Sequence, residues 1–199
     1  MPPAKVFDAP VIWFTGPSGA GKSTIATGVL RVLQDRGTAV EVLDGDEIRN
    51  ELSPDLGFTK ADRDLQVSRL GYLAHLLSRN SVLVLVSAIS PYRESRDRAL
   101  SRSKRRFEIH VHADLDVLIA RDTKGLYRRA IAGEISGLTG YDDPYEAPLD
   151  PDLVIDTAQS SLQDSIDAVL DLLDQGVQQG VQRGDQRGVQ RGDQIDKSA

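Results

Sequence analysis

The segment from Gly16 to Ser23 has the composition and spacing of a loop that binds phosphate groups. It fits the pattern G-x-x-x-x-G-K-[ST] and lies between an apolar run and an amphipathic stretch. Glycines let backbone N–H groups surround phosphate oxygens, and the N-terminus of the following helix adds its positive dipole end. Lys22 is predicted to reach the β- and γ-phosphates, and the Ser23 hydroxyl to ligate Mg²⁺. The residues predicted to bind a nucleoside triphosphate are Gly16, Ser18, Gly19, Ala20, Gly21, Lys22, Ser23 and Thr24.

A second polar group, Asp44, Asp46 and Arg49, follows the next apolar run. Phosphoryl transfer needs one carboxylate near the acceptor hydroxyl and another to hold Mg²⁺, and an anionic acceptor needs a cation. The third apolar run ends at Ser87 without an aspartate, so both duties are predicted to rest on Asp44 and Asp46, with Asp46 and Ser23 at the metal. The same residues also fit an Asp-Gly turn in which Asp46 caps a helix, and capping is compatible with catalysis.

The elements that must position these groups alternate between strands and helices. Strands are predicted at 11–15, 40–43, 81–87, 107–111 and 153–155. Helices are predicted at 22–36, 46–52, 59–79, 92–103, 115–120 and 161–173. The apolar run at 83–86 is continuous rather than alternating, which is typical of a strand covered on both faces. The pattern predicts an α/β fold with a doubly wound parallel sheet, whose loops at 15–22, 44–49, 87–93 and 112–116 share the ligand-binding rim.

Composition indicates a single globular domain with a tail. The chain has 199 residues, a net charge of −6 and no cysteine. These values fit a cytoplasmic enzyme acting on small molecules, with no nucleic-acid partner, no membrane span and no disulfide; a homodimer is compatible with them. We predict an N-terminal segment at 1–8, a P-loop kinase domain at 9–173, and a disordered Gln/Arg/Gly/Asp repeat at 174–199. We attribute the two Arg-Gly-Asp triplets in that repeat to the repeat itself rather than to adhesion.

Six separated motifs together resemble the adenylylsulfate kinase family over residues 8–173. They are the segments at 16–23, 44–49, 55–63, 89–97, 121–127 and 139–148. The resemblance implies the architecture of a P-loop nucleoside triphosphate kinase and the use of ATP with Mg²⁺. It also implies transfer of the γ-phosphate of ATP to the 3′-hydroxyl of adenosine 5′-phosphosulfate. The product would be 3′-phosphoadenosine 5′-phosphosulfate, the activated sulfate donor.

The resemblance also implies roles for particular side chains. Arg49 and Arg63 would bind the phosphosulfate, Phe58 would stack on the acceptor adenine, and Arg121 would pack against the donor adenine. A basic lid over 124–129 would bring Lys124 over the transferred phosphate. The implied catalytic residues are Lys22, Asp44, Asp46, Ser90 and Lys124. The implied acceptor-binding residues are Arg49, Phe58, Arg63, Gln66, Ile89, Ser90, Lys124, Gly125, Leu126 and Leu138.

The chain departs from the family pattern around the acceptor. Gln66 stands where Asn is common, and Ala88 and Leu138 stand where Phe is common. Thr123 replaces a common Pro, and Tyr141 replaces an Ile and is a candidate for the ring that is missing at Leu138. Two other readings therefore stay open at this point. The chain could be a paralogous kinase for another hydroxyl acceptor, or a nucleotide-binding module without catalysis, which the intact Lys22 and Asp pair disfavour.

Overall fold

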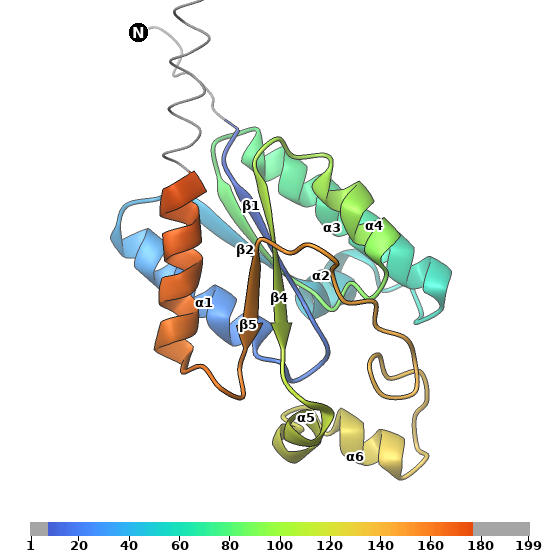
Figure 1. Ribbon diagram of the computed structural model, residues 1–199. Helices are drawn as coiled ribbons and strands as arrows, with labels where there is room; N and C mark the ends of the chain where they lie inside the picture. Colours follow the sequence, from blue (N-terminus) through green and yellow to red (C-terminus); the bar gives the residue numbers. More distant parts are fainter. Residues whose placement is uncertain (1–7, 177–199) are drawn as a thin grey trace, which may run out of the picture.

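Five parallel strands form the centre of the molecule (Figure 1). The computed structural model describes residues 8–176. The strands are β1 (Val11–Thr15), β2 (Val40–Asp44), β3 (Leu83–Ser87), β4 (Arg106–His112) and β5 (Leu153–Asp156), and their order in the sheet is β2-β3-β1-β4-β5. The helices are α1 (Lys22–Asp35), α2 (Gly45–Leu52), α3 (Lys60–Ser78), α4 (Arg93–Leu100), α5 (Leu115–Arg121), α6 (Leu126–Ile131) and a last helix at 162–176.

Helices cover both faces of the sheet, which confirms the predicted doubly wound α/β fold. Figure 1 shows α3 and α4 on one face, with α1 and the helix at 162–176 on the other. The central strand β1 supplies both cores because successive side chains of a strand point to opposite faces. Ile12 and Phe14 pack into the core beneath α1, whereas Val11 and Trp13 pack beneath α3 and α4. The fully apolar β1 and β3 follow from this double coverage.

The strand order places the phosphate loop at the point where ligands bind in such sheets. Successive connections leave β1 for β2 on one side and later reach β4 on the other. A crevice therefore opens beyond the carboxyl ends of the strands next to β1. In Figure 1, α5 and α6 lie at this same end of the sheet.

Element boundaries differ from the sequence predictions where local backbone geometry decides. β3 begins at Leu83 rather than at 81 because Ser81 has a φ of 66°, which a strand cannot accommodate. Helix α6 (Leu126–Ile131) was not predicted: two backbone N–H groups of its first turn, those of Tyr127 and Arg128, donate to the Asp122 carboxylate. The last helix runs to 176, three residues past the predicted domain boundary at 173. Residues 1–7 of the predicted N-terminal segment (1–8) and residues 177–199 of the predicted repeat (174–199) lie outside the described residues. None of the helices within 8–176 is long and apolar enough to cross a membrane.

Close packing of α3 on α4 generates a stability prediction. A Cβ added at Gly71 would lie 2.9 Å from the backbone Cα of Ala99, so Gly71→Ala must push the two helices apart. We expect the free energy of unfolding to fall by about 1–3 kcal/mol, as for other overpacked cores. Urea denaturation followed by far-ultraviolet circular dichroism measures it.

Gly28→Ala on α1 is the matched control. There the added Cβ would lie 2.2 Å from Cδ1 and 2.8 Å from Cγ1 of Ile166, so the clash is with one side chain and not with backbone. A rotation of that side chain can relieve it without moving a helix, and alanine favours the helix. Gly28→Ala should therefore cost less than Gly71→Ala. Equal stability of Gly71→Ala and the unchanged protein would show that the α3–α4 contact is not tight.

Candidate active site

A cleft of about 690 Å³ opens at the carboxyl ends of β1, β2 and β3. It gathers residues that are far apart in the sequence: the phosphate loop, the start of α2, the loop after β3, the start of α6 and the segment at 135–139. Seventeen predicted site residues line it: Ser18, Gly19, Gly21, Lys22, Ser23, Thr24, Asp44, Asp46, Arg49, Phe58, Arg63, Gln66, Ile89, Ser90, Lys124, Leu126 and Leu138. Four others, Gly16, Ala20, Arg121 and Gly125, are not among its lining residues.

The phosphate loop is held tightly against the end of β4. A Cβ at Gly16 would lie 1.9 Å from the carbonyl oxygen of Val111, so only glycine fits there. Inside the loop, Lys22 Nζ donates hydrogen bonds to the carbonyl oxygens of Gly16 at 2.8 Å and Pro17 at 2.7 Å. Burial, reinforced by the charge of Lys124, lowers the pKa of Lys22 to about 8. The amine is still mostly protonated at neutral pH, so the loop encloses a cation.

A hydroxyl–carboxylate cluster joins the ends of β2 and β3 to the start of α1 beside this cation. Ser23 Oγ donates to Asp44 Oδ2 at 2.6 Å and lies 3.0 Å from Ser87 Oγ. The other oxygen of Asp44 accepts from the backbone N–H of Asp46 at 2.9 Å and caps α2. The residue that caps α2 is therefore Asp44. The sequence had suggested Asp46 for this role. Ser87 was missed as a site residue, although the absent aspartate at the end of β3 was a signal for it.

The Asp46 carboxylate points instead to Lys124, with which it forms an ion pair across the cleft. Lys124 precedes α6, and α6 is fastened to the phosphate loop because Tyr127 OH donates to the Ser18 carbonyl oxygen at 3.1 Å. Gly125, just after Lys124, has a φ of 65°, which lets the chain turn into α6. The predicted lid residue and the predicted catalytic carboxylate thus meet in the structure.

Aromatic and cationic side chains from α2, the loop after it and α3 form another wall of the cleft. The exposed Phe58 ring has the Arg49 guanidinium 4.9 Å and that of Arg63 5.9 Å from its centroid. Among the described residues, Arg49 on α2 is hydrogen-bonded only to backbone carbonyls of the loop that follows this helix, through Nη1 to Gly57 O at 2.7 Å and Leu56 O at 3.4 Å. Its remaining donors can reach a ligand.

Arg63 differs from Arg49 because it is buried and its donors are engaged. Nε donates to Phe58 O at 2.8 Å, Nη2 donates to Gly137 O at 2.7 Å, and Nη1 donates to Thr139 Oγ1. Nη2 also lies 3.3 Å from Asp143 Oδ2. Arg63 therefore ties α3 to the segment at 137–143, a role that the sequence did not reveal.

The departures from the family pattern lie on this wall. Leu138 is buried and lines the cleft, but Tyr141 is absent from the lining and packs edge-on against Tyr127 at 6.4 Å. The suggestion that Tyr141 supplies the missing ring is therefore wrong for this structure. Gln66 is buried at the cleft with its Nε2 3.3 Å from Gly45 O, whereas its Oε1 has no hydrogen-bond partner among the described residues. That oxygen is a free acceptor for a ligand.

Arg121 lies on another side of the phosphate loop. Its guanidinium donates to Oγ1 and the carbonyl oxygen of Thr157, at 2.8 and 2.7 Å. Thr157 Oγ1 in turn donates to the Ala20 carbonyl oxygen at 3.1 Å. The contact of Arg121 with a donor adenine stays a prediction.

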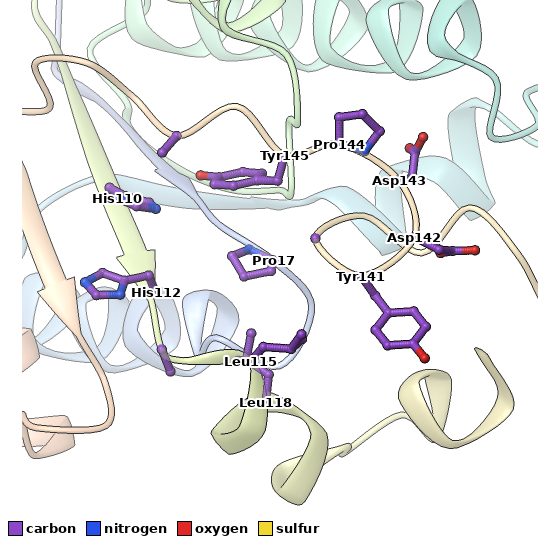
Figure 2. Close-up of a pocket in the computed structure, with 13 residues that line it drawn as sticks. Pro17, His110, His112, Leu115, Leu118, Tyr141, Asp142, Asp143, Pro144 and Tyr145 are labelled. Carbon is purple, nitrogen blue, oxygen red and sulfur yellow. The ribbon is translucent and has the colours of Figure 1, made fainter. Parts of the chain in front are cut away.

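A second, more open pocket of about 610 Å³ lies next to the cleft, behind Pro17 (Figure 2). One wall consists of three stacked rings, in which the centroid of His110 lies 5.8 Å from that of Tyr145 and 5.2 Å from that of His112. Burial, helped by the neighbouring His112, lowers the pKa of His110 to about 4, so its ring is neutral at neutral pH. The loop at 112–116 opens here: it lies at the carboxyl edge of the parallel sheet with the other three loops, as predicted, but it lines this second pocket rather than the cleft.

The strand order, the lysine inside a glycine loop and the carboxylates beyond β2 define a P-loop kinase. A family model for adenylylsulphate kinase matches residues 8–156. The chain belongs to the adenylylsulfate kinase family.

Relatives and solved structures agree with this assignment. An adenylyl-sulfate kinase of Chloroflexus aurantiacus is 55% identical over 139 residues, which cover 70% of this chain and 75% of that protein. A probable adenylyl-sulfate kinase of Pyrococcus abyssi is 52% identical and is covered over 79% of its length. The structure of the APS kinase of Mycobacterium tuberculosis in complex with AMPPNP and APS superposes with a TM-score of 0.82 at 42% identity, covering 84% of this chain and 99% of that one.

The dual role of Asp44 generates a prediction. In Asp44→Asn the amide oxygen still caps α2, because asparagine caps helices as well as aspartate does. The negative charge beside Ser23 is lost. We expect turnover to fall by roughly ten- to a hundredfold, about 1.4–2.7 kcal/mol of barrier, while the melting temperature stays nearly unchanged.

Asp44→Ala serves as the comparison, because it removes the cap as well and should cost about 1 kcal/mol of stability. Steady-state kinetics and thermal melts of the two variants measure both effects. Full turnover in Asp44→Asn would mean that Asp44 acts only as a cap.

Proposed function

We infer that this protein is an ATP-dependent adenylyl-sulfate kinase. It transfers the γ-phosphate of ATP to the 3′-hydroxyl of adenosine 5′-phosphosulfate and forms ADP and 3′-phosphoadenosine 5′-phosphosulfate. The observation that carries this conclusion is one cleft that holds the phosphate loop at one end and the Phe58–Arg49 wall at the other. Family membership identifies the acceptor that such a cleft takes.

At the donor end, the phosphates would lie in the loop where Lys22 now bonds its own backbone. Exchange of the Gly16 and Pro17 carbonyls for phosphate oxygens gives the ammonium group charged partners, which bind it more strongly. The neighbouring Ser23, Asp44 and Asp46 offer the hard oxygen ligands that Mg²⁺ prefers, and we propose that they hold this ion directly or through water. Bound there, Mg²⁺ would neutralise charge on the β- and γ-phosphates.

In the transfer step, we propose that Asp46 orients the acceptor hydroxyl and takes its proton. The bond from phosphorus to the ADP oxygen breaks as the bond to the 3′-oxygen forms. Asp46 must first leave its ion pair with Lys124. Lys124 is then free to contact the transferred phosphoryl group, where negative charge is spread over the oxygens.

At the acceptor end, Phe58 presents an exposed face on which an adenine ring can stack. Arg49 has unused donors for the phosphosulfate, and the unpartnered Gln66 Oε1 can accept a hydrogen bond from the acceptor. Leu138 offers an aliphatic surface where a ring is common in the family. Ile89 and Ser90 line the same end of the cleft, whereas Gly125 and Leu126 belong to the lid.

The test is a direct assay of the acceptor. The purified protein is incubated with ATP and Mg²⁺ and with adenosine 5′-phosphosulfate, AMP or no acceptor, and products are separated by chromatography. We expect 3′-phosphoadenosine 5′-phosphosulfate in equal amount to ADP, and clearly less product from AMP. Turnover of ATP with another alcohol but not with adenosine 5′-phosphosulfate would refute the assignment.

Removal of the loop cation gives a prediction for the donor end. Lys22→Ala should lower kcat/KM by at least roughly a hundredfold, about 2.7 kcal/mol, because the cation acts where charge builds up. Lys104→Ala is the control, since Lys104 is exposed and pairs with Asp8. Near-normal activity of Lys22→Ala would remove the basis of the assigned donor site.

The two arginines beside Phe58 give a prediction for the acceptor end. Arg49→Ala should raise KM for adenosine 5′-phosphosulfate by roughly tenfold or more, through lost charge-assisted hydrogen bonds of about 1.5–3 kcal/mol, and leave the melting temperature unchanged. Arg63→Ala should raise the same KM and also lower the melting temperature, because Arg63 holds the segment at 137–143. In both variants KM for ATP should barely move. A rise in KM for ATP without a rise in KM for adenosine 5′-phosphosulfate would contradict the assignment of these arginines to the acceptor end.

We also propose that the enzyme acts in the cytoplasm, because the absence of cysteine fits a reducing compartment. Cell fractionation tests this point. A homodimer stays a prediction compatible with the sequence, and light scattering of the purified protein tests it.

A further inference from the structure

A fully buried guanidinium, that of Arg96 on α4, joins three segments behind the acceptor end of the cleft. Its Nη1 donates to Ser90 O in the loop after β3 at 2.7 Å, and its Nη2 donates to Glu146 O at 2.8 Å. Its Nε donates to Glu108 Oε1 on β4 at 2.7 Å. Each of the three guanidinium nitrogens thus donates a hydrogen bond to a different segment of the chain.

The loop that Arg96 holds has a strained backbone. Ser90 has a φ of 46°, and a non-glycine residue in this region persists only where its surroundings impose the conformation. Three further hydrogen bonds impose it: Thr15 Oγ1 to Ile89 O at 2.8 Å, Trp13 Nε1 to Ser90 Oγ at 3.1 Å, and the Glu146 backbone N–H to Pro91 O at 2.8 Å.

The same contacts connect the loop to the wall of the second pocket. Tyr145 precedes Glu146, its ring lines that pocket (Figure 2), and its hydroxyl lies 3.0 Å from Thr15 Oγ1. The Arg96 guanidinium lies 5.9 Å from the centroid of this ring. The segment at 145–146 thus packs behind the loop, and the side chains of Arg96 and Thr15 each bond to both.

We propose that Arg96 is a positioning residue for the acceptor site. Its guanidinium fixes the backbone at 89–91, and Ile89, Ser90 and Pro91 in turn line the cleft. The proposal rests on the proposed function, which makes that end of the cleft the acceptor site. Stability alone explains Arg96 poorly, because a buried ion pair such as Arg96–Glu108 contributes little net stability once desolvation is counted. Bridging two carbonyls while pairing with a carboxylate requires the rigid arginine fork, which lysine lacks.

Arg96→Lys tests the proposal, because it keeps the positive charge near Glu108 but cannot bridge the two carbonyls. We expect KM for adenosine 5′-phosphosulfate to rise by roughly tenfold and KM for ATP to change by less than about twofold. Glu108→Gln is the matched control: the amide oxygen can still accept from Arg96, and both carbonyl contacts remain. It should lower the melting temperature without changing KM for adenosine 5′-phosphosulfate.

The single tryptophan of the chain gives a readout that needs no enzyme activity. Trp13 is fully buried, and its indole N–H donates to Ser90 Oγ, so its one indole ¹H–¹⁵N resonance reports the position of the loop. Ser90→Ala calibrates the shift that follows loss of this hydrogen bond. The resonance should move in the same direction in Arg96→Lys and stay in place in Glu108→Gln.

Arg96→Gln combined with Glu108→Gln is used if Arg96→Lys does not fold, since it leaves no buried charge unpaired. It should show the same selective rise in KM and the same shift of the indole resonance. Unchanged KM and resonance in a folded variant, or loss of folding in both, would overturn the proposal and make Arg96 a group of the core. If the unchanged protein did not phosphorylate adenosine 5′-phosphosulfate, the proposed function would fail, but the indole resonance would still decide whether Arg96 positions the loop.

Discussion

The lateral register of three parallel strands is the constraint on which the site depends. Asp44 on β2 lies opposite Ser87 on β3, and Ser87 lies opposite Phe14 on β1, one residue before the end of that strand. This register brings the Asp44 carboxylate and the Ser87 hydroxyl to the Ser23 hydroxyl at the start of α1. A slip of one residue would turn each of these side chains to the opposite face of the sheet.

Charged groups in the described part of the cleft are held by partners that substrates can replace. Lys22 bonds to carbonyls of its own loop, and Lys124 pairs with Asp46. Phosphate oxygens are stronger partners for an ammonium group than neutral carbonyls are, so binding of ATP favours the exchange. The same exchange releases the Asp46 carboxylate, which we propose as the group that takes the acceptor proton. In this proposal, binding and preparation for catalysis are linked through the Lys124–Asp46 ion pair.

Arginines at the acceptor end fall into two groups with different physical roles. Among the described residues, the guanidinium of Arg49 has N–H donors without a protein partner. The guanidinium groups of Arg63 and Arg96 instead donate to backbone carbonyls of other segments. A buried guanidinium that satisfies several carbonyls costs desolvation but fixes their relative positions. The two buried arginines thereby hold the segments at 137–143 and 89–91, which carry no regular secondary structure. The acceptor site is built on loops, and these side chains give the loops a defined shape.

Sequence alone determined what depends on local pattern: the phosphate loop, the alternation of strands and helices, the doubly wound sheet, and the family through six spaced motifs. It also placed most cleft residues, because parallel strands deliver their following loops to one edge. Tertiary structure decided what depends on contacts between distant segments. Asp44 rather than Asp46 caps α2, and Tyr141 packs on Tyr127 instead of lining the cleft. The loop at 112–116 lines a separate pocket, and the Asp122 carboxylate accepts hydrogen bonds from the first turn of α6. The resemblance implied an acceptor role for Arg63 and none for Arg96, and only the packing of the chain shows that both are buried, because hydrogen bonds between remote segments leave no periodic signal in the sequence.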